Sequence, residues 1–160
     1  MAPSRLSALA LLLAASTLAV TACSPGTSDG GPTANDREAV RAITTAESHA
    51  GGRAFQIEAD AGAWEVHVAG GDRDVEVRLS DDGGEVRSSS DRGALDADDR
   101  TALDAASTTL ADAVRIAAAQ RPGGVVEEGE LERDGATARW SIELEGGVTV
   151  RVSATDGSVG

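Results

Sequence analysis

The chain contains an internal repeat with a period near 73 residues, and this repeat limits the folds that it can adopt. Four segments of the first half recur in the same order in the second half, at offsets of 72, 76, 73 and 73 residues. The pairs are Gly51-Gly52 with Gly123-Gly124, Trp64-Glu65-Val66 with Trp140-Ser141-Ile142, Val75–Ser80 with Val148–Ser153, and Gly84-Glu85-Val86 with Gly157-Ser158-Val159. The repeat predicts two small units of the same fold.

A helix is predicted at the start of each copy. In the first copy Asn35 is a suitable N-cap, apolar residues follow at helical spacing, and Gly51-Gly52 end the helix. In the second copy Thr109-Leu110-Ala111-Asp112 is a possible capping box, and Pro122-Gly123-Gly124 stop the helix. Each unit is therefore expected to begin with one helix.

Three strands are predicted after each helix, because apolar and polar residues alternate with a period of two. The strands are Ala54–Ala59, Ala63–Ala69, Asp74–Ser80, Val125–Arg133, Ala138–Glu145 and Val148–Ala154. The apolar residues, among them Trp64 and Trp140, would face the helix, and the other face of each sheet would be polar and wet. The predicted fold class is α+β, with two tandem α-β-β-β units, each a helix packed on a three-stranded antiparallel sheet.

These elements set the expected boundaries of the units. Residues 36–87 form unit 1 and residues 104–160 form unit 2. Residues 88–103 are either a linker or an extension of the second helix back to about Asp98, so that residues 98–120 would be one helix. Residues 23–35 contain no large apolar residue, which is typical of a flexible tether.

Residues 1–22 have the pattern of a secretory signal peptide. Arg5 precedes an apolar run over residues 6–20 that is short for a membrane span. Val20-Thr21-Ala22-Cys23 resembles the bacterial lipobox, which implies cleavage before Cys23, diacylglycerol on its thiol and acylation of its new amino group. This lipid is the only covalent group expected and no other cofactor is predicted. The protein would be anchored on the extracytoplasmic face of the cell membrane.

The charge and the single cysteine exclude several classes of protein. The net charge is −13, and removal of residues 1–22 leaves 138 residues with a charge of −14, since only Arg5 is lost. Nucleic-acid binding is not expected, because phosphate contacts need a basic face. An intramolecular disulfide needs a second cysteine besides Cys23.

No catalytic or metal-binding constellation is evident in the sequence. His67 lies between Val66 and Val68 and should point to the polar face as a solvated strand residue, and His49 suits the negative end of the first helix. No third metal ligand accompanies either histidine at useful spacing, and Ser88-Ser89-Ser90 has no paired base. The acidic pairs Asp81-Asp82, Asp98-Asp99 and Glu127-Glu128 lack the spacing of an EF-hand loop and are read as solvated turns and helix starts. The chain is predicted not to be an enzyme.

The second copy resembles the PepSY domain, which occurs in propeptides of thermolysin-like metallopeptidases and in bacterial envelope proteins. The resemblance covers residues 109–159, with Pro122-Gly123-Gly124, Glu128-Gly129-Glu130-Leu131-Glu132, Trp140-Ser141-Ile142 and the ending Val150–Val159. Ser153 stands where the family usually has Asp. Copy 1 is less similar. The architecture resembles actinobacterial lipoproteins with two PepSY units, and the use of Arg without Lys suits a high-GC coding sequence.

The resemblance implies a non-enzymatic module that binds an envelope or secreted protein, such as a peptidase that it inhibits or regulates. The wet sheet faces are the expected contact surface, through Glu65, His67, Glu76, Arg78, Ser141, Glu143, Thr149 and Arg151. Strand addition at an exposed sheet edge is a second mode of binding that needs only backbone groups. The alternative function is an acidic, calcium-binding or structural envelope lipoprotein.

Overall fold

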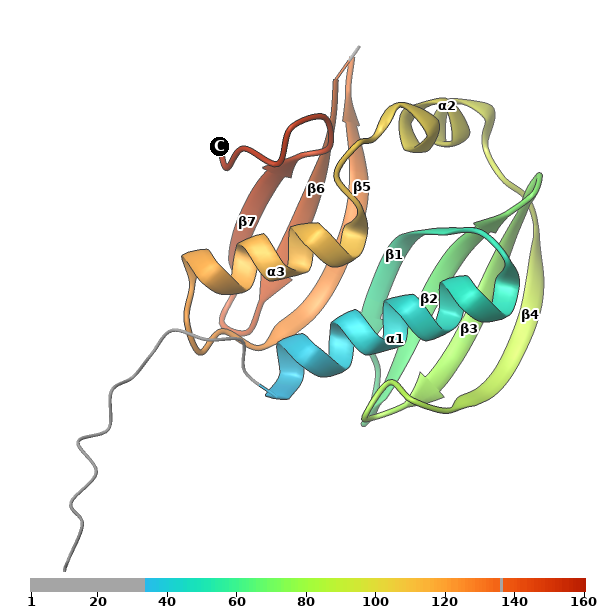
Figure 1. The fold of residues 1–160 in the computed structure, drawn as a ribbon, viewed down its shortest axis with the longest axis horizontal. Helices are drawn as coiled ribbons and strands as arrows, with labels where there is room; N and C mark the ends of the chain where they lie inside the picture. The colour runs from blue at the N-terminus through green and yellow to red at the C-terminus, as the bar shows by residue number, and fades with distance from the viewer. Residues whose placement is uncertain (1–33, 136) are drawn as a thin grey trace, which may run out of the picture.

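The computed structural model describes residues 34–135 and 137–160 of the chain, and in them it contains three helices and seven strands (Figure 1). The elements of the first half are α1 (Ala34–Ala50), β1 (Arg53–Ala59), β2 (Ala63–Gly70), β3 (Arg73–Ser80) and β4 (Val86–Ala94). Those that follow are α2 (Ala97–Ala105), α3 (Leu110–Gln120), β5 (Val126–Asp134), β6 (Thr137–Leu144) and β7 (Val148–Ser153). The predicted signal segment 1–22 and Cys23 lie outside the described residues.

All seven strands form one antiparallel sheet, in the order β4-β3-β2-β1-β5-β6-β7. The α+β class is confirmed, and a helix followed by three antiparallel strands occurs twice, as α1-β1-β2-β3 and α3-β5-β6-β7. The expectation that each unit has its own three-stranded sheet is wrong. β1 pairs with β5, because each would otherwise expose an edge of unpaired backbone groups.

The six predicted strands agree with the observed ones to within about a residue at each end. The segment 88–103, expected as a linker or helix extension, instead contributes most of β4 and of α2. β4 is rich in Ser and Arg, so apolar and polar residues do not alternate along it. Its backbone hydrogen bonds to the free edge of β3 stabilise it as a strand. Residues 98–120 are not one helix, because α2 ends at Ala105 and α3 begins at Leu110.

The end of α1 and the start of α3 are formed by the residues that the sequence predicts, whereas the start of α1 is not. Gly51 has φ of 69° and its N–H donates to the carbonyl of Glu47, which ends α1. The hydroxyl of Thr109 accepts the N–H of Asp112 at the start of α3. The exception is Asn35, which lies inside α1 and accepts the N–H of Val126 at 2.6 Å, so it joins the two units and is not a cap.

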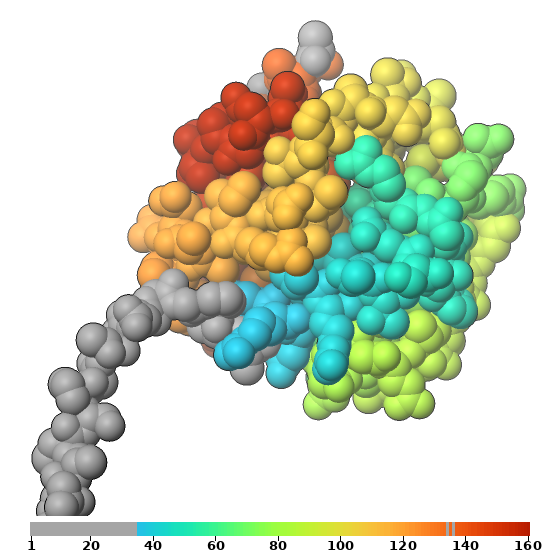
Figure 2. All heavy atoms as spheres, viewed as in Figure 1, coloured from blue at the N-terminus to red at the C-terminus, as the bar shows by residue number. Residues whose placement is uncertain are grey.

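The two units share one hydrophobic core beneath α1 and α3. Figure 1 shows these helices over one face of the sheet, and in Figure 2 the atoms of the two helical segments, blue to cyan and light orange, lie side by side. Trp64 and Trp140 are buried at equivalent positions, and their indole N–H groups donate to the carbonyls of Asp81 and Thr108 at 2.8 and 3.0 Å. The core therefore fixes the units to each other as one body. No helix within the described residues is long and apolar enough to cross a membrane.

Candidate functional site

The sheet face opposite α1 and α3, here called the open face, carries all eight residues that the sequence predicts as a contact surface. Cross-strand pairing sets them in two parallel rows. The first row is Arg78, Glu65, Glu58, Glu128, Glu143 and Thr149, and the second is Glu76, His67, Gln56, Glu130, Ser141 and Arg151. Helices α1 and α3 lie on the other face of the sheet (Figure 1), and near the β1–β5 junction Asp99 of α2 lines the same hollow as Glu130.

The residues in the middle of the two rows were not predicted from the sequence as part of the contact surface. Glu58, Gln56, Glu128 and Glu130 belong to β1 and β5, and they link the predicted residues of unit 1 to those of unit 2. Their alternation with buried residues was visible in the sequence. The pairing of β1 with β5 was not, because nothing local specifies which distant strand an edge accepts.

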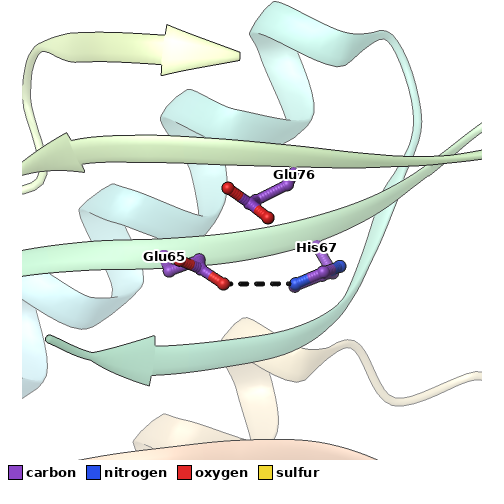
Figure 3. A group of neighbouring side chains, drawn as sticks. All are labelled: Glu65, His67 and Glu76. Atoms are coloured by element: carbon purple, nitrogen blue, oxygen red, sulfur yellow. Dashed lines mark ion pairs between the residues drawn. The ribbon is translucent and has the colours of Figure 1, made fainter. Parts of the chain in front are cut away.

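The histidine cluster consists of Glu65, His67, Asp74, Glu76 and Arg78 on β2 and β3. Nδ1 of His67 lies 2.8 Å from Oδ1 of Asp74, and Nε2 lies 3.5 Å from Oε1 of Glu65. Glu76 is the direct cross-strand neighbour of His67, and Figure 3 shows its carboxylate on the same side of the strands as Glu65 and His67. The side chain of His67 is only 16% exposed, and those of Glu65 and Glu76 are 18% and 12% exposed. His67 points to the polar face as predicted, but it is largely buried and not solvated.

Phe55 and the flanking carboxylates explain this burial of His67. The ring of Phe55 lies 5.8 Å from the His67 ring, tilted by 59°. Phe55 reaches it because a β-bulge between Ala54 and Gln56 adds a residue to β1. The carboxylates of Asp74 and Glu65 lie beside the two ring nitrogens of His67 and shield them from solvent.

Arginines neutralise part of this cluster. Arg78 donates to Oε2 of Glu65 and also lies 3.3 Å from Asp60 and 3.5 Å from Glu76. The carboxylate of Glu65 raises the pKa of Arg78 above its usual value. Arg92 of β4 lies 3.2 Å from the second oxygen of Glu76. Both glutamates of the cluster are thus held in place from outside by guanidinium groups.

The acidic seam consists of Glu58, Glu128, Glu130 and Glu143, where β1, β5 and β6 meet. Glu58 faces Glu128 directly across the β1–β5 pair, and Glu128 faces Glu143 across the next pair. Burial, followed by the charges of Glu130, Glu58 and Glu143, raises the pKa of Glu128 above its usual value. Within the described part of the chain, none of the four carboxylates forms an ion pair with a basic side chain.

The acidic pairs identified in the sequence do not form sites of their own. Asp82 accepts from the Ser80 hydroxyl and the Gly84 N–H, and the Ser80 bond is the main cause that lowers its pKa. Asp98 and Asp99 lie in the first turn of α2 and are 3.2 and 2.8 Å from Arg133.

The other histidine, acidic and serine residues considered in the sequence are exposed away from the histidine cluster, or their described contacts are not those of a catalytic group. Glu127 is exposed, and its neighbour Glu128 belongs to the acidic seam. His49 is exposed in the last turn of α1. The ring nitrogens of His67 face carboxylates and not hydroxyl groups, and Ser88-Ser89-Ser90 is exposed on β4.

Comparison with known proteins identifies the second unit. Residues 109–159 match the family model described as the peptidase propeptide and YPEB domain, so this segment, from α3 to the end of the sheet, is a PepSY domain. No curated protein matches the chain. Among solved structures, a candidate lipoprotein from Clostridium difficile 630 is similar in fold, with 18% identity and a TM-score of 0.45 over 74% of this chain and 86% of that chain.

Proposed function

We propose that the protein is a non-enzymatic, lipid-anchored module of the cell envelope that binds a partner protein on the open face of its sheet. One observation carries this proposal: the two units join edge to edge, so their polar faces lie side by side on one seven-stranded sheet, opposite α1 and α3. A helix layer already buries the opposite face, which leaves the open face as the broad surface for a partner.

The charge of this surface favours a basic partner. The four carboxylates of the acidic seam have no ion pair among the described residues, and Glu58 and Glu130 are exposed. Complementary charge accelerates association and fixes the orientation of a partner more than it adds affinity. The net charge of −14 left after removal of residues 1–22 would also steer a basic protein toward this chain from a distance.

The PepSY domain supports a peptidase as the partner, because its family model is named for peptidase propeptides. In this proposal the chain inhibits or regulates that peptidase. The lipobox-like segment ending at Cys23 supports anchoring on the extracytoplasmic face of the membrane, with residues 24–33 as part of the tether. The carboxylate partners of His67 support a role without catalysis, since none of its contacts within residues 34–135 and 137–160 is a hydroxyl nucleophile.

Two double variants with the same change in net charge test this proposal. Glu130→Lys with Glu143→Lys reverses charge in the acidic seam, whereas Glu85→Lys with Asp104→Lys reverses two exposed acids outside the open face. The lipoprotein is purified from native membranes in mild detergent at low salt, and co-purifying envelope proteins are quantified. We expect the seam variant to retain about tenfold less of its partner and the control to retain it fully. Equal recovery in both variants, or recovery of no envelope protein by the wild type, would contradict the proposal.

A second candidate function is calcium binding, and the unneutralised acidic seam is the observation that favours it. Calcium prefers six to eight oxygen ligands, and four carboxylates supply part of such a set. Calorimetric titration of the same variants with calcium separates the two functions. Saturable heat in the wild type that disappears in the seam variant would support calcium binding as the function of the seam.

A further inference from the structure

We propose that Glu65, His67 and Glu76 form a binding site for a single divalent transition-metal ion of the zinc class. One ligand atom from each of the three residues lies within 4.8 Å of the others. The three side chains come from two neighbouring strands and occupy one side of the sheet (Figure 3). This inference goes beyond protein binding and does not depend on it.

The separation of two of the ligand atoms fits a metal ion directly. Nε2 of His67 and Oε1 of Glu65 are 3.5 Å apart. Two ligands at about 2.1 Å from zinc, at a tetrahedral angle, are about 3.4 Å apart. The present separation of these two atoms therefore suits an ion bound to both, and Glu76 on the neighbouring strand would supply the third ligand.

Asp74 prepares the imidazole for this role. A histidine that binds a metal commonly donates its other ring N–H to a carboxylate, which fixes the tautomer and increases the basicity of the ligating nitrogen. In this cluster Nδ1 lies 2.8 and 3.1 Å from the two oxygens of Asp74, so Nε2 is the nitrogen directed at Glu65. The protein thus supplies the carboxylate and the histidine of a carboxylate–histidine–metal arrangement.

The outer oxygens of the glutamates are held in a similar way. Arg78 binds Oε2 of Glu65 and leaves Oε1 facing His67. Arg92 lies 3.2 Å from Oε2 of Glu76. These guanidinium groups orient the carboxylates: Oε1 of Glu65 remains directed at Nε2 of His67, whereas Oε1 of Glu76 lies 3.5 Å from Nε of Arg78 and would exchange this contact for the metal.

The charge of the surroundings also suits a divalent cation. Four carboxylates and two guanidinium groups belong to this network: Asp60, Glu65, Asp74 and Glu76 with Arg78 and Arg92. With a neutral imidazole the network has a net charge of −2, which one divalent ion neutralises. The nitrogen ligand favours zinc over calcium or magnesium, which prefer oxygen ligands.

The chain offers a matched control, because His49 is its only other histidine and is exposed on α1. Zinc binding is measured by calorimetry and by equilibrium dialysis with metal analysis. The full chain carries Cys23→Ser, so that no thiol competes for the metal. Circular dichroism and thermal unfolding without metal establish that each variant is folded.

We expect one zinc ion per chain, retained in the presence of millimolar calcium. His67→Asn should weaken zinc binding by more than about 100-fold, Glu76→Gln should also weaken it, and Asp74→Asn should weaken it by about 10–100-fold through the imidazole. His49→Asn should leave it unchanged. Cobalt in place of zinc should give the intense visible absorption of a four-coordinate site. Absence of saturable zinc binding by the wild type, or equal affinity in folded His67→Asn and His49→Asn chains, would overturn the assignment.

Discussion

The Nδ1 atom of His67 lies 2.8 Å from a carboxylate oxygen of Asp74, on the neighbouring strand of the sheet. Both side chains are largely shielded from solvent, with exposed fractions of 16% and 21%. This contact orients the imidazole on the open face.

Asp74→Ala should destabilise the fold, because it leaves a mostly buried ring nitrogen without its partner. We expect a loss of about 1 kcal/mol in the free energy of unfolding, measured by urea denaturation at neutral pH. Asp104→Ala is the control, since Asp104 is exposed, and it should have no measurable effect. An unchanged unfolding free energy in Asp74→Ala would show that the contact contributes nothing to stability.

Glu128→Gln should stabilise the protein at neutral pH, because Glu128 faces Glu58 and Glu143 across the strands. Like charges directly opposite each other cost about 0.2–1 kcal/mol. Burial and these charges raise the pKa of Glu128 above its ordinary 4.5, so the folded state binds its proton more tightly than the unfolded chain does.

This shift fixes the pH dependence of the Glu128→Gln effect. In the wild type, the cost of the Glu128 charge is absent below about pH 4.5 and grows as the pH rises through the raised pKa of the folded state. The stabilisation by Gln should therefore be present at pH 7 and fade toward pH 4, as measured by thermal unfolding. Glu127→Gln, at an exposed neighbouring position, is the control. A stabilisation that is the same at pH 4 and pH 7 would contradict the electrostatic cause.

Gly129→Ala should weaken the junction of the two units. A Cβ atom at this position would lie 3.0 Å from Cδ1 of Ile142 and 3.2 Å from side-chain atoms of Ile57 and Leu110. Such overpacking costs about 1–3 kcal/mol, which denaturant unfolding would detect. Adding Ile142→Val removes the nearest methyl group and should recover part of the loss. If the single Ala variant were as stable as the wild type, the junction would be looser than described.

Cys23→Ala should release the protein from the membrane. Metabolic labelling with a palmitate analogue and detergent phase partitioning measure the anchor directly, and the variant should lack the label and leave the detergent phase. Ser24→Ala, at the next residue, should behave as the wild type. Labelling that persists in Cys23→Ala would place the lipid elsewhere or show that the membrane association has another cause.

The sequence was sufficient to predict the six alternating strands and the buried positions of Trp64 and Trp140. These features depend on local periodicity, and the repeat presents each of them twice. β4 was not predictable, because Ser88-Ser89-Ser90 has no strand pattern of its own and becomes a strand only by pairing with β3. The junction of β1 with β5 was missed because pairing between residues about 70 positions apart has no local signal.

In the candidate site, too, some features were predictable from the sequence and others were not. The direction of His67 followed from its position between two buried valines, and the polar faces were correctly identified. The proximity of Glu76 and Asp74 depends on the register of β2 with β3, and the contact with Phe55 depends on a β-bulge. Neither the register nor the bulge is specified by residue spacing, so the cluster became visible only in three dimensions.

The use of the open face as the binding surface is tested most directly by photo-crosslinking in intact cells. A photoreactive residue is placed at Ser90 or Thr149, both exposed on the sheet, and at Ser48 of α1 or Ala119 of α3 as helix-layer controls. We expect the two sheet positions to form the same covalent adduct with one envelope protein, and the helix positions to form none. An adduct that arises from Ser48 or Ala119 and not from the sheet positions would contradict the proposal.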